Sequence, residues 1–259
     1  MRACALALLL AATGCHHADP PWAQAGSPHP GEATIAGAPA AVVRAAAPPV
    51  IDGVLDDAVW ASATTLGPLV EPGNGAPAPR SPVASFARLA WDDHALYLAF
   101  VVRDQQPSSP FARADVDPHV WGASSGIEAM LQPGDPGDNR DYYELQIDVN
   151  GAVFDSHFDD YNQPITGVGP ARTYGHQDWS SQVTRAVHVV DGRLYAVEAA
   201  LPWSALAAAR VAVPPRPGDV WRLNLYAFRD GQRQAVAWSP LRGMGNFHRA
   251  TRFGRIRFE

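Results

Sequence analysis

From about residue 48 onward, the chain alternates apolar and polar side chains in short runs separated by turn residues. Such alternation predicts strands with one buried face, because successive side chains of a strand point to opposite sides of the sheet. Pairs of runs around a short turn predict three hairpins: 84–91 with 95–102, 143–149 with 152–158, and 182–190 with 193–201. Asn150-Gly151 and Asp191-Gly192 support two of these hairpins, since both dipeptides favour the backbone of a tight hairpin turn.

Further apolar runs predict four more strands, at 127–131, 220–229, 234–238 and 253–258. Short helical turns are expected at 56–60 and 202–206. About ten strands with one or two helical turns are typical of an all-β fold, and we expect an antiparallel β-sandwich of the immunoglobulin or jelly-roll kind. All-β domains can run to about 200–250 residues, so one domain over 48–259 is expected.

The first residues have the pattern of an exported protein. Arg2, the apolar run 5–12 and the small residues before Cys15 predict a signal peptide over 1–14, which is too short to span a bilayer. The segment 12–15, Ala-Thr-Gly-Cys, resembles a bacterial lipobox and implies lipidation at Cys15, with an ordinary cleaved signal as the alternative. We therefore expect an exported protein that contacts the membrane only through a lipid anchor, at the outer membrane of the cell envelope.

Residues 15–47 are rich in Ala, Pro and Gly and show no apolar periodicity. Such a segment buries too little surface to offset its ordering entropy. We expect it to be a tether that holds the folded domain away from the bilayer.

Composition narrows the function. The chain has 20 basic and 26 acidic side chains, every basic one an arginine, and a formal net charge of −6, which argues against a nucleic-acid partner. The lack of lysine excludes Schiff-base chemistry and a phosphate-loop lysine, and the lack of cysteine after Cys15 excludes a cysteine nucleophile in the domain. No serine-hydrolase or zinc-protease motif occurs, so a binding protein is favoured over an enzyme.

Two aromatic residues stand in loop-like surroundings. Trp121 lies between Asp117-Pro118-His119-Val120 and Gly122-Ala123-Ser124-Ser125-Gly126, and Phe247 lies in a Gly-rich stretch. An exposed aromatic ring beside polar groups is a platform for the apolar face of a sugar ring. Together the two residues indicate carbohydrate binding.

The chain resembles family 9 carbohydrate-binding modules over nearly all of 48–259. The resemblance rests on Ile-Asp-Gly-Val-Leu-Asp-Asp-Ala-Val-Trp at 51–60, and on further segments in the family's order at 90–98, 121–128, 197–203, 237–240 and 253–256. It implies a β-sandwich that holds a sugar between two aromatic rings, here Trp121 and Phe247, with Glu128 on the following strand. Gln146 and Tyr226 stand where the family has an arginine and a glutamine. Arg140, Asn246 and His248 are neighbouring candidates.

The resemblance also implies structural calcium. Asp52, Asp56 and Asp57 offer oxygen ligands in a tight loop, although turn and helix-capping chemistry explains the same residues.

The leading hypothesis is non-catalytic binding of a poly- or oligosaccharide at the cell envelope in support of carbohydrate catabolism, by a monomer. One alternative is a DOMON-type domain that binds haem b for electron transfer, with Met130 or Met244 and a histidine as axial ligands. A second is glycoside hydrolysis by acidic residues near the sugar site. A structural role in an envelope complex is a third.

Overall fold

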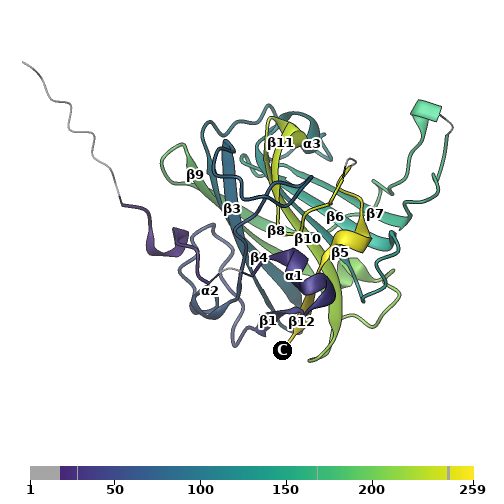
Figure 1. Ribbon diagram of the computed structural model, residues 1–259, viewed down its shortest axis with the longest axis horizontal. Coiled ribbons are helices and arrows are strands. Elements are labelled where there is room, and N and C mark those ends of the chain that lie inside the picture. The colour runs from purple at the N-terminus through teal and green to yellow at the C-terminus, as the bar shows by residue number, and fades with distance from the viewer. Residues whose placement is uncertain (1–17, 28, 168, 244–245) are drawn as a thin grey trace, which may run out of the picture.

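The protein is described here from a computed structural model (Figure 1), which describes residues 18–27, 29–167, 169–243 and 246–259. The predicted signal peptide and Cys15 lie outside the described residues, as does Met244. Within the described ranges, no helix is long and apolar enough to cross a membrane.

The fold consists of strands with a few short helices. The strands are β1 (Ala40–Arg44), β2 (Thr65–Leu66), β3 (Val83–Trp91), β4 (Ala95–Asp104), β5 (Gly126–Gln132), β6 (Arg140–Asp148), β7 (Val153–Asp160), β8 (Thr184–Val189), β9 (Leu194–Pro202), β10 (Val220–Arg229), β11 (Gln234–Ala237) and β12 (Gly254–Phe258). The α-helices are α1 (Gly31–Ala36), α2 (Ala58–Ser62) and α3 (Val120–Ala123). The 3-10 turns in the described residues are η1 (Pro21–Ala23), η2 (Gly169–Ala171), η3 (Trp203–Leu206), η4 (Gly231–Arg233) and η5 (Ala250–Arg252).

The strands form one mixed sheet that folds into two packed halves, β7-β6-β5-β10-β12 and β3-β4-β9-β8, with β1 between them. The order is β7-β6-β5-β10-β12-β1-β3-β4-β9-β8, with β11 on β10 and β2 on β3. The three predicted hairpins are confirmed as β3–β4, β6–β7 and β8–β9, each antiparallel. The remaining predicted strands and both helical turns are confirmed as well. The all-β prediction therefore holds, although β1 pairs in parallel with both of its neighbours, so the sheet is mixed.

The core lies between the two halves. Its largest members are tryptophan and phenylalanine side chains that meet edge to face, among them Trp91, Trp221 and Phe258. Aromatic pairs of this geometry add to the stabilisation that burial alone provides.

The Asp-Gly turn after Ile51 is fixed to the core by a buried carboxylate. Glu198 on β9 accepts hydrogen bonds from the backbone amides of Asp52 and Gly53, both at 3.0 Å, and from the indole Nε1 of Trp60 at 2.8 Å. A buried carboxylate requires such donors, because an unpaired charge inside a protein is costly. This network gives the spacing between the turn and Trp60 a structural role.

The prediction of a tether over 15–47 is wrong for its described part. Ala40 pairs with Ile256 of β12 and Val43 pairs with Ala90 of β3, so β1 links the two halves of the sheet. Upstream, α1 packs on β12, and the side-chain oxygen of Thr34 accepts a hydrogen bond from the amide of Arg255 at 2.6 Å. The prediction failed because five residues rich in alanine give almost no periodic signal, and the pairing partners lie far away in the sequence.

Because β1 is an integral strand, Val42→Ala is expected to lower the free energy of unfolding by about 2 kcal/mol, since it removes two buried methyl groups and leaves a cavity. Val42 is fully buried. Urea denaturation measures the effect, and Val50→Ala is the matched control because Val50 is 64% exposed. Equal effects of the two substitutions would contradict the role of β1 as an integral strand and would support the predicted tether.

Candidate functional site

Strands β5, β6 and β10 lie side by side and are covered on both faces. Their odd-numbered residues, such as Ile127, Leu145 and Leu225, enter the core between the two halves. Their even-numbered residues face the opposite way, because side chains alternate along a strand. The candidate site lies on this second face.

Three predicted residues form one row across these strands. Glu128 on β5 is paired with Gln146 on β6 and with Tyr226 on β10, and all three are fully buried. The family resemblance predicted each of these residues separately, from its position in the sequence. The registers of β5–β6 and β5–β10 bring them together.

A second carboxyl group, Glu144, lies beside this row. The Nε2 of Gln146 donates to Glu128 Oε2 at 3.0 Å and to Glu144 Oε1 at 2.6 Å. Burial, together with the nearby charge of Glu144, raises the pKa of Glu128 well above its ordinary value. Burial also raises the pKa of Glu144, to about 7. The two carboxyl groups therefore retain a proton near neutral pH, because two adjacent buried charges repel each other.

Two oxygens in the row have no partner among the described residues: Glu128 Oε1 and Gln146 Oε1, both buried. Buried polar atoms of this kind are rare, because each one forfeits the hydrogen bond that it makes in water. The amide oxygen of Gln146 accepts, and Glu128 Oε1 accepts when the carboxyl group is ionised and can donate when it is protonated, so a hydroxyl group is a suitable partner for either of them.

The turn η4, which follows β10, covers the row. Its residue Gln232 donates from Nε2 to Glu128 Oε2 at 2.6 Å. The turn rests on α3: the amide of Gly231 donates to the Ser124 carbonyl, and a Cβ at Gly231 would lie 2.5 Å from the Trp121 carbonyl oxygen. Only glycine permits this approach, and Gly231 also has a positive φ of 63°.

The two predicted aromatic platforms differ in their surroundings. Trp121 is 42% exposed on α3 and stacks on His119, with ring centroids 5.3 Å apart. Phe247 is only 7% exposed, and its ring stacks on that of Tyr226 at 3.9 Å. Trp121 therefore presents a free face, whereas the Phe247 ring is packed against the protein itself. The contribution of Phe247 to sugar binding stays a prediction.

His248 lies at the inner end of an aromatic stack. Its Nδ1 is 2.7 Å from the hydroxyl of Tyr142, and its ring lies parallel to that of Tyr161, with centroids 4.1 Å apart. Tyr174 stacks on the outer side of Tyr161. Burial lowers the pKa of His248 to about 3, so its imidazole is neutral under ordinary conditions. The stack runs from the surface to the carboxyl pair, since His248 Nε2 is 3.9 Å from Glu144 Oε2.

The remaining sugar-site candidates lie at the outer edge. Arg140 is exposed and forms an ion pair with Asp160 at 3.0 Å. The side-chain amide of exposed Asn246 donates to the hydroxyl of Tyr161.

Sequence reasoning missed the roles of Glu144 and Tyr142, although both share the alternation of Gln146 along β6. It missed Tyr161 and Gln232 because neither has a local signal.

The predicted calcium ligands act as acceptors for nearby backbone amides. Asp52 Oδ1 accepts from the amide of Val54, and Asp57 Oδ2 accepts from the amide of Val50. Within the described residues, these aspartates with Asp56 are not among the carboxylate and imidazole groups close enough to share one ion. Calcium binding at this loop stays a prediction.

The chain is similar to known proteins in sequence and in fold. The family described as "Carbohydrate family 9 binding domain-like" matches residues 51–259. Solved structures similar to the chain include a family 9 carbohydrate-binding module from Caldicellulosiruptor kristjanssonii in complex with cellotriose, at 15% identity and a TM-score of 0.56, covering 85% of this chain and 93% of that one. The same module in complex with glucose is also similar, at 15% identity and a TM-score of 0.56, covering 85% and 95%.

A putative carbohydrate-binding protein from Bacteroides uniformis is also similar, at 18% identity and a TM-score of 0.64, covering 85% of this chain and 98% of that one. At these identities the likeness of the structures shows the fold. No curated protein matches the chain.

The carboxyl pair makes stability depend on pH. The pKa of Glu144 is about 7 in the folded protein against 4.5 as the ordinary value, so its contribution is complete below pH 4.5 and is lost as the pH rises through 7. Glu144→Gln is expected to abolish much of this loss, which is about 3 kcal/mol for a shift of this size. Urea denaturation at pH 5 and pH 8 measures it.

Asp178→Asn serves as the control for the pH experiment, because the Asp178 side chain is 92% exposed. It should leave the difference between pH 5 and pH 8 unchanged. A Glu144→Gln chain that keeps the full pH dependence would contradict the assignment.

Proposed function

Because residues 51–259 place the chain in the carbohydrate family 9 binding domain-like family, we propose that its β5–β6–β10 face is a non-catalytic binding site for a glycan. The observation that carries the proposal is the buried polar row on this face. Glu128 and Gln146 each keep an oxygen there that has no partner within the described ranges, and the exposed ring of Trp121 stands on the adjoining helix. Hydroxyl groups and an apolar ring face are the two features that a pyranose offers to such a site.

The sugar reaches the row when η4 moves aside. Gln232 now donates to the same Glu128 oxygen that also accepts from Gln146, so the turn occupies the position of a ligand. A sugar hydroxyl can replace the amide of Gln232 without leaving Glu128 unpaired, and this exchange costs little because one hydrogen bond substitutes for another. Trp121 then supplies the stacking surface at the rim.

The second platform is Phe247, from the loop that leads to β12. Its ring becomes available to a ligand when the loop moves away from Tyr226, whose hydroxyl now donates to the Phe247 carbonyl at 3.2 Å. Asn246 and Arg140 remain exposed at the same edge, where they can donate to the outer hydroxyls of a longer chain.

Glucose and cellotriose are the first ligands to test, because the similar solved modules carry them. Haem binding and glycoside hydrolysis are not proposed. Met130, one of the two methionines considered as an axial ligand, is fully buried in an apolar cluster with Tyr142 and Phe158. The carboxyl groups of Glu128 and Glu144 share the amide of a single glutamine, which gives them a common role in holding the polar row.

We also propose that the chain is an exported, lipid-anchored monomer that retains glycans at the outer membrane in support of carbohydrate catabolism. The support is the sequence alone: the apolar run 5–12 and the Ala-Thr-Gly-Cys segment that ends at Cys15. Anchoring would keep a weakly binding domain close to the polymer, which raises its effective local concentration.

Trp121→Ala is expected to weaken binding of cellotriose by about 10-fold, because an aromatic stacking contact contributes about 0.5–1.5 kcal/mol beyond burial. Isothermal titration calorimetry measures the affinity, preceded by a broad glycan array in case cellotriose is not bound. Val116→Ala is the matched control, since Val116 is 88% exposed and lies outside the polar row. Unchanged binding of every glycan by the Trp121→Ala chain would refute the proposed site.

Cys15→Ser is expected to release the protein from the membrane fraction of cells that express the full chain, because the thiol that accepts the lipid is lost. Fractionation and metabolic labelling with a fatty acid measure the anchor. Cys4→Ser should still be labelled, since Cys4 lies within the predicted signal peptide. Equal labelling of the two variants would exclude Cys15 as the lipidation site.

A further inference from the structure

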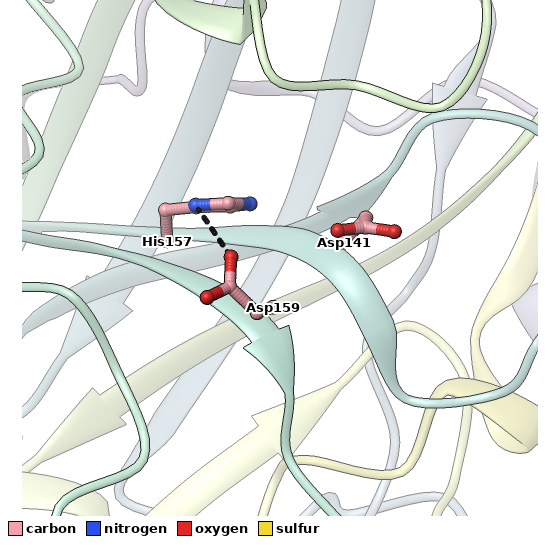
Figure 2. A group of neighbouring side chains, drawn as sticks. All are labelled: Asp141, His157 and Asp159. Atoms are coloured by element: carbon pink, nitrogen blue, oxygen red, sulfur yellow. Dashed lines mark ion pairs between the residues drawn. The ribbon is translucent and has the colours of Figure 1, made fainter. Parts of the chain in front are cut away.

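A second polar cluster lies on the opposite face of the β6–β7 hairpin from the sugar site. It consists of Asp141 on β6 with His157 and Asp159 on β7 (Figure 2). Arg140 pairs with Asp160 and Tyr142 pairs with Phe158, so Asp141 and Asp159 lie opposite each other between these two pairs. One ligand atom from each of the three residues lies within 4.8 Å of the others.

His157 is an unpartnered polar side chain aimed into this cluster. Only 9% of its side chain is exposed, and its Nε2 is buried without a hydrogen-bond partner among the described residues. Its Nδ1 faces Asp159 Oδ1 at 3.6 Å, and Figure 2 shows the Nε2 end of the ring turned toward Asp141. A buried nitrogen left unpaired in this way needs a partner that the described part of the chain does not supply.

The cluster also carries an excess of negative charge. Like charges directly opposite each other on adjacent strands destabilise a sheet. Arg210 offsets one of them through its Nε, 2.7 Å from Asp141 Oδ2, and His176 Nε2 lies 2.6 Å from Asp159 Oδ2. Each of these contacts uses only one oxygen of its carboxylate, so both carboxylates keep a second oxygen as a ligand.

We propose that Asp141, His157 and Asp159 form a binding site for a divalent transition-metal ion of the Zn²⁺ class. One imidazole nitrogen with two carboxylate oxygens is a donor set that suits such ions, whereas Ca²⁺ takes oxygen ligands alone. A zinc ion lies about 2.0–2.2 Å from each ligand, so two of its ligands are at most about 4.4 Å apart. Small rotations of the two aspartates, which lie near the surface, bring the three atoms within that limit. His176 is a further nitrogen donor at the edge of the cluster.

Such an ion would link β6 to β7 close to where β7 ends. The segment that follows β7 carries Tyr161 and Tyr174 into the aromatic stack of the sugar site. Between the two tyrosines the segment extends away from the sheets, with η2 at its far end (Figure 1). The ion would therefore stabilise the base of a segment that borders the sugar site, while its ligands lie on the other face of the sheet. Metal binding and glycan binding can be tested separately for this reason.

The experiment uses the purified chain after treatment with a chelator, titrated with Zn²⁺ by calorimetry and with Co²⁺ by visible absorption. The expected result is saturable binding of one ion, a ligand-field band for Co²⁺ and a Zn²⁺-dependent rise in Tm. His157→Asn is expected to weaken this binding at least 10-fold. His188→Asn is the control, since His188 lies exposed on β8, and it should bind as the unmodified chain does.

Asp159→Asn provides a second test, because its side chain is 61% exposed and its substitution keeps the shape of the residue. It decides the matter if the His157→Asn chain does not fold. The proposal is overturned if Zn²⁺ does not bind, if the variants bind it as tightly as the control, or if Ca²⁺ binds at this cluster in preference to Zn²⁺. Glycan binding is measured in parallel so that the two proposals are tested separately. If the unmodified chain binds Zn²⁺ but no glycan, the result counts against the proposed function alone.

Discussion

The burial of β5, β6 and β10 on both faces is the constraint from which the rest of the structure follows. One face closes the core between the two halves of the sheet, and the other holds a row of polar side chains. A buried carboxyl group such as Glu128 has to be paired or neutral, because an isolated charge is costly inside a protein. Three features meet this requirement: the amide of Gln146, the proton retained because burial raises the pKa of Glu128, and the turn that carries Gln232.

The same alternation separates the two proposed sites along one hairpin. On β6 and β7, Tyr142, Glu144 and Phe158 face the sugar site, while Asp141 and His157 face the other way. A one-residue slip in the register would exchange the two sets of side chains. The register is fixed by the apolar side chains of β6 that enter the core, so the core determines the position of both clusters.

The sequence predicted nearly all of the strands but only part of the site. Hairpins with clear alternation and Asn-Gly or Asp-Gly turns were located closely, because their signal is local. Glu128, Gln146 and Tyr226 were found through a family resemblance, and the registers of three strands then placed them in one row. Gln232 and Tyr161 could not be found in this way, because each approaches the row from a connecting segment whose path no local pattern specifies.

What the sequence determined by itself is therefore the set of strands, their buried faces and the class of fold, since these follow from alternation over neighbouring residues. Tertiary contacts alone make β1 the link between the two halves, because its residues Ala-Ala-Val-Val-Arg acquire their role from partners at distant points of the chain. These contacts also leave Trp121 exposed while Phe247 packs on Tyr226. Whether an aromatic ring on a loop is free or covered depends on what packs against it, and that contact is made between segments that are remote in sequence.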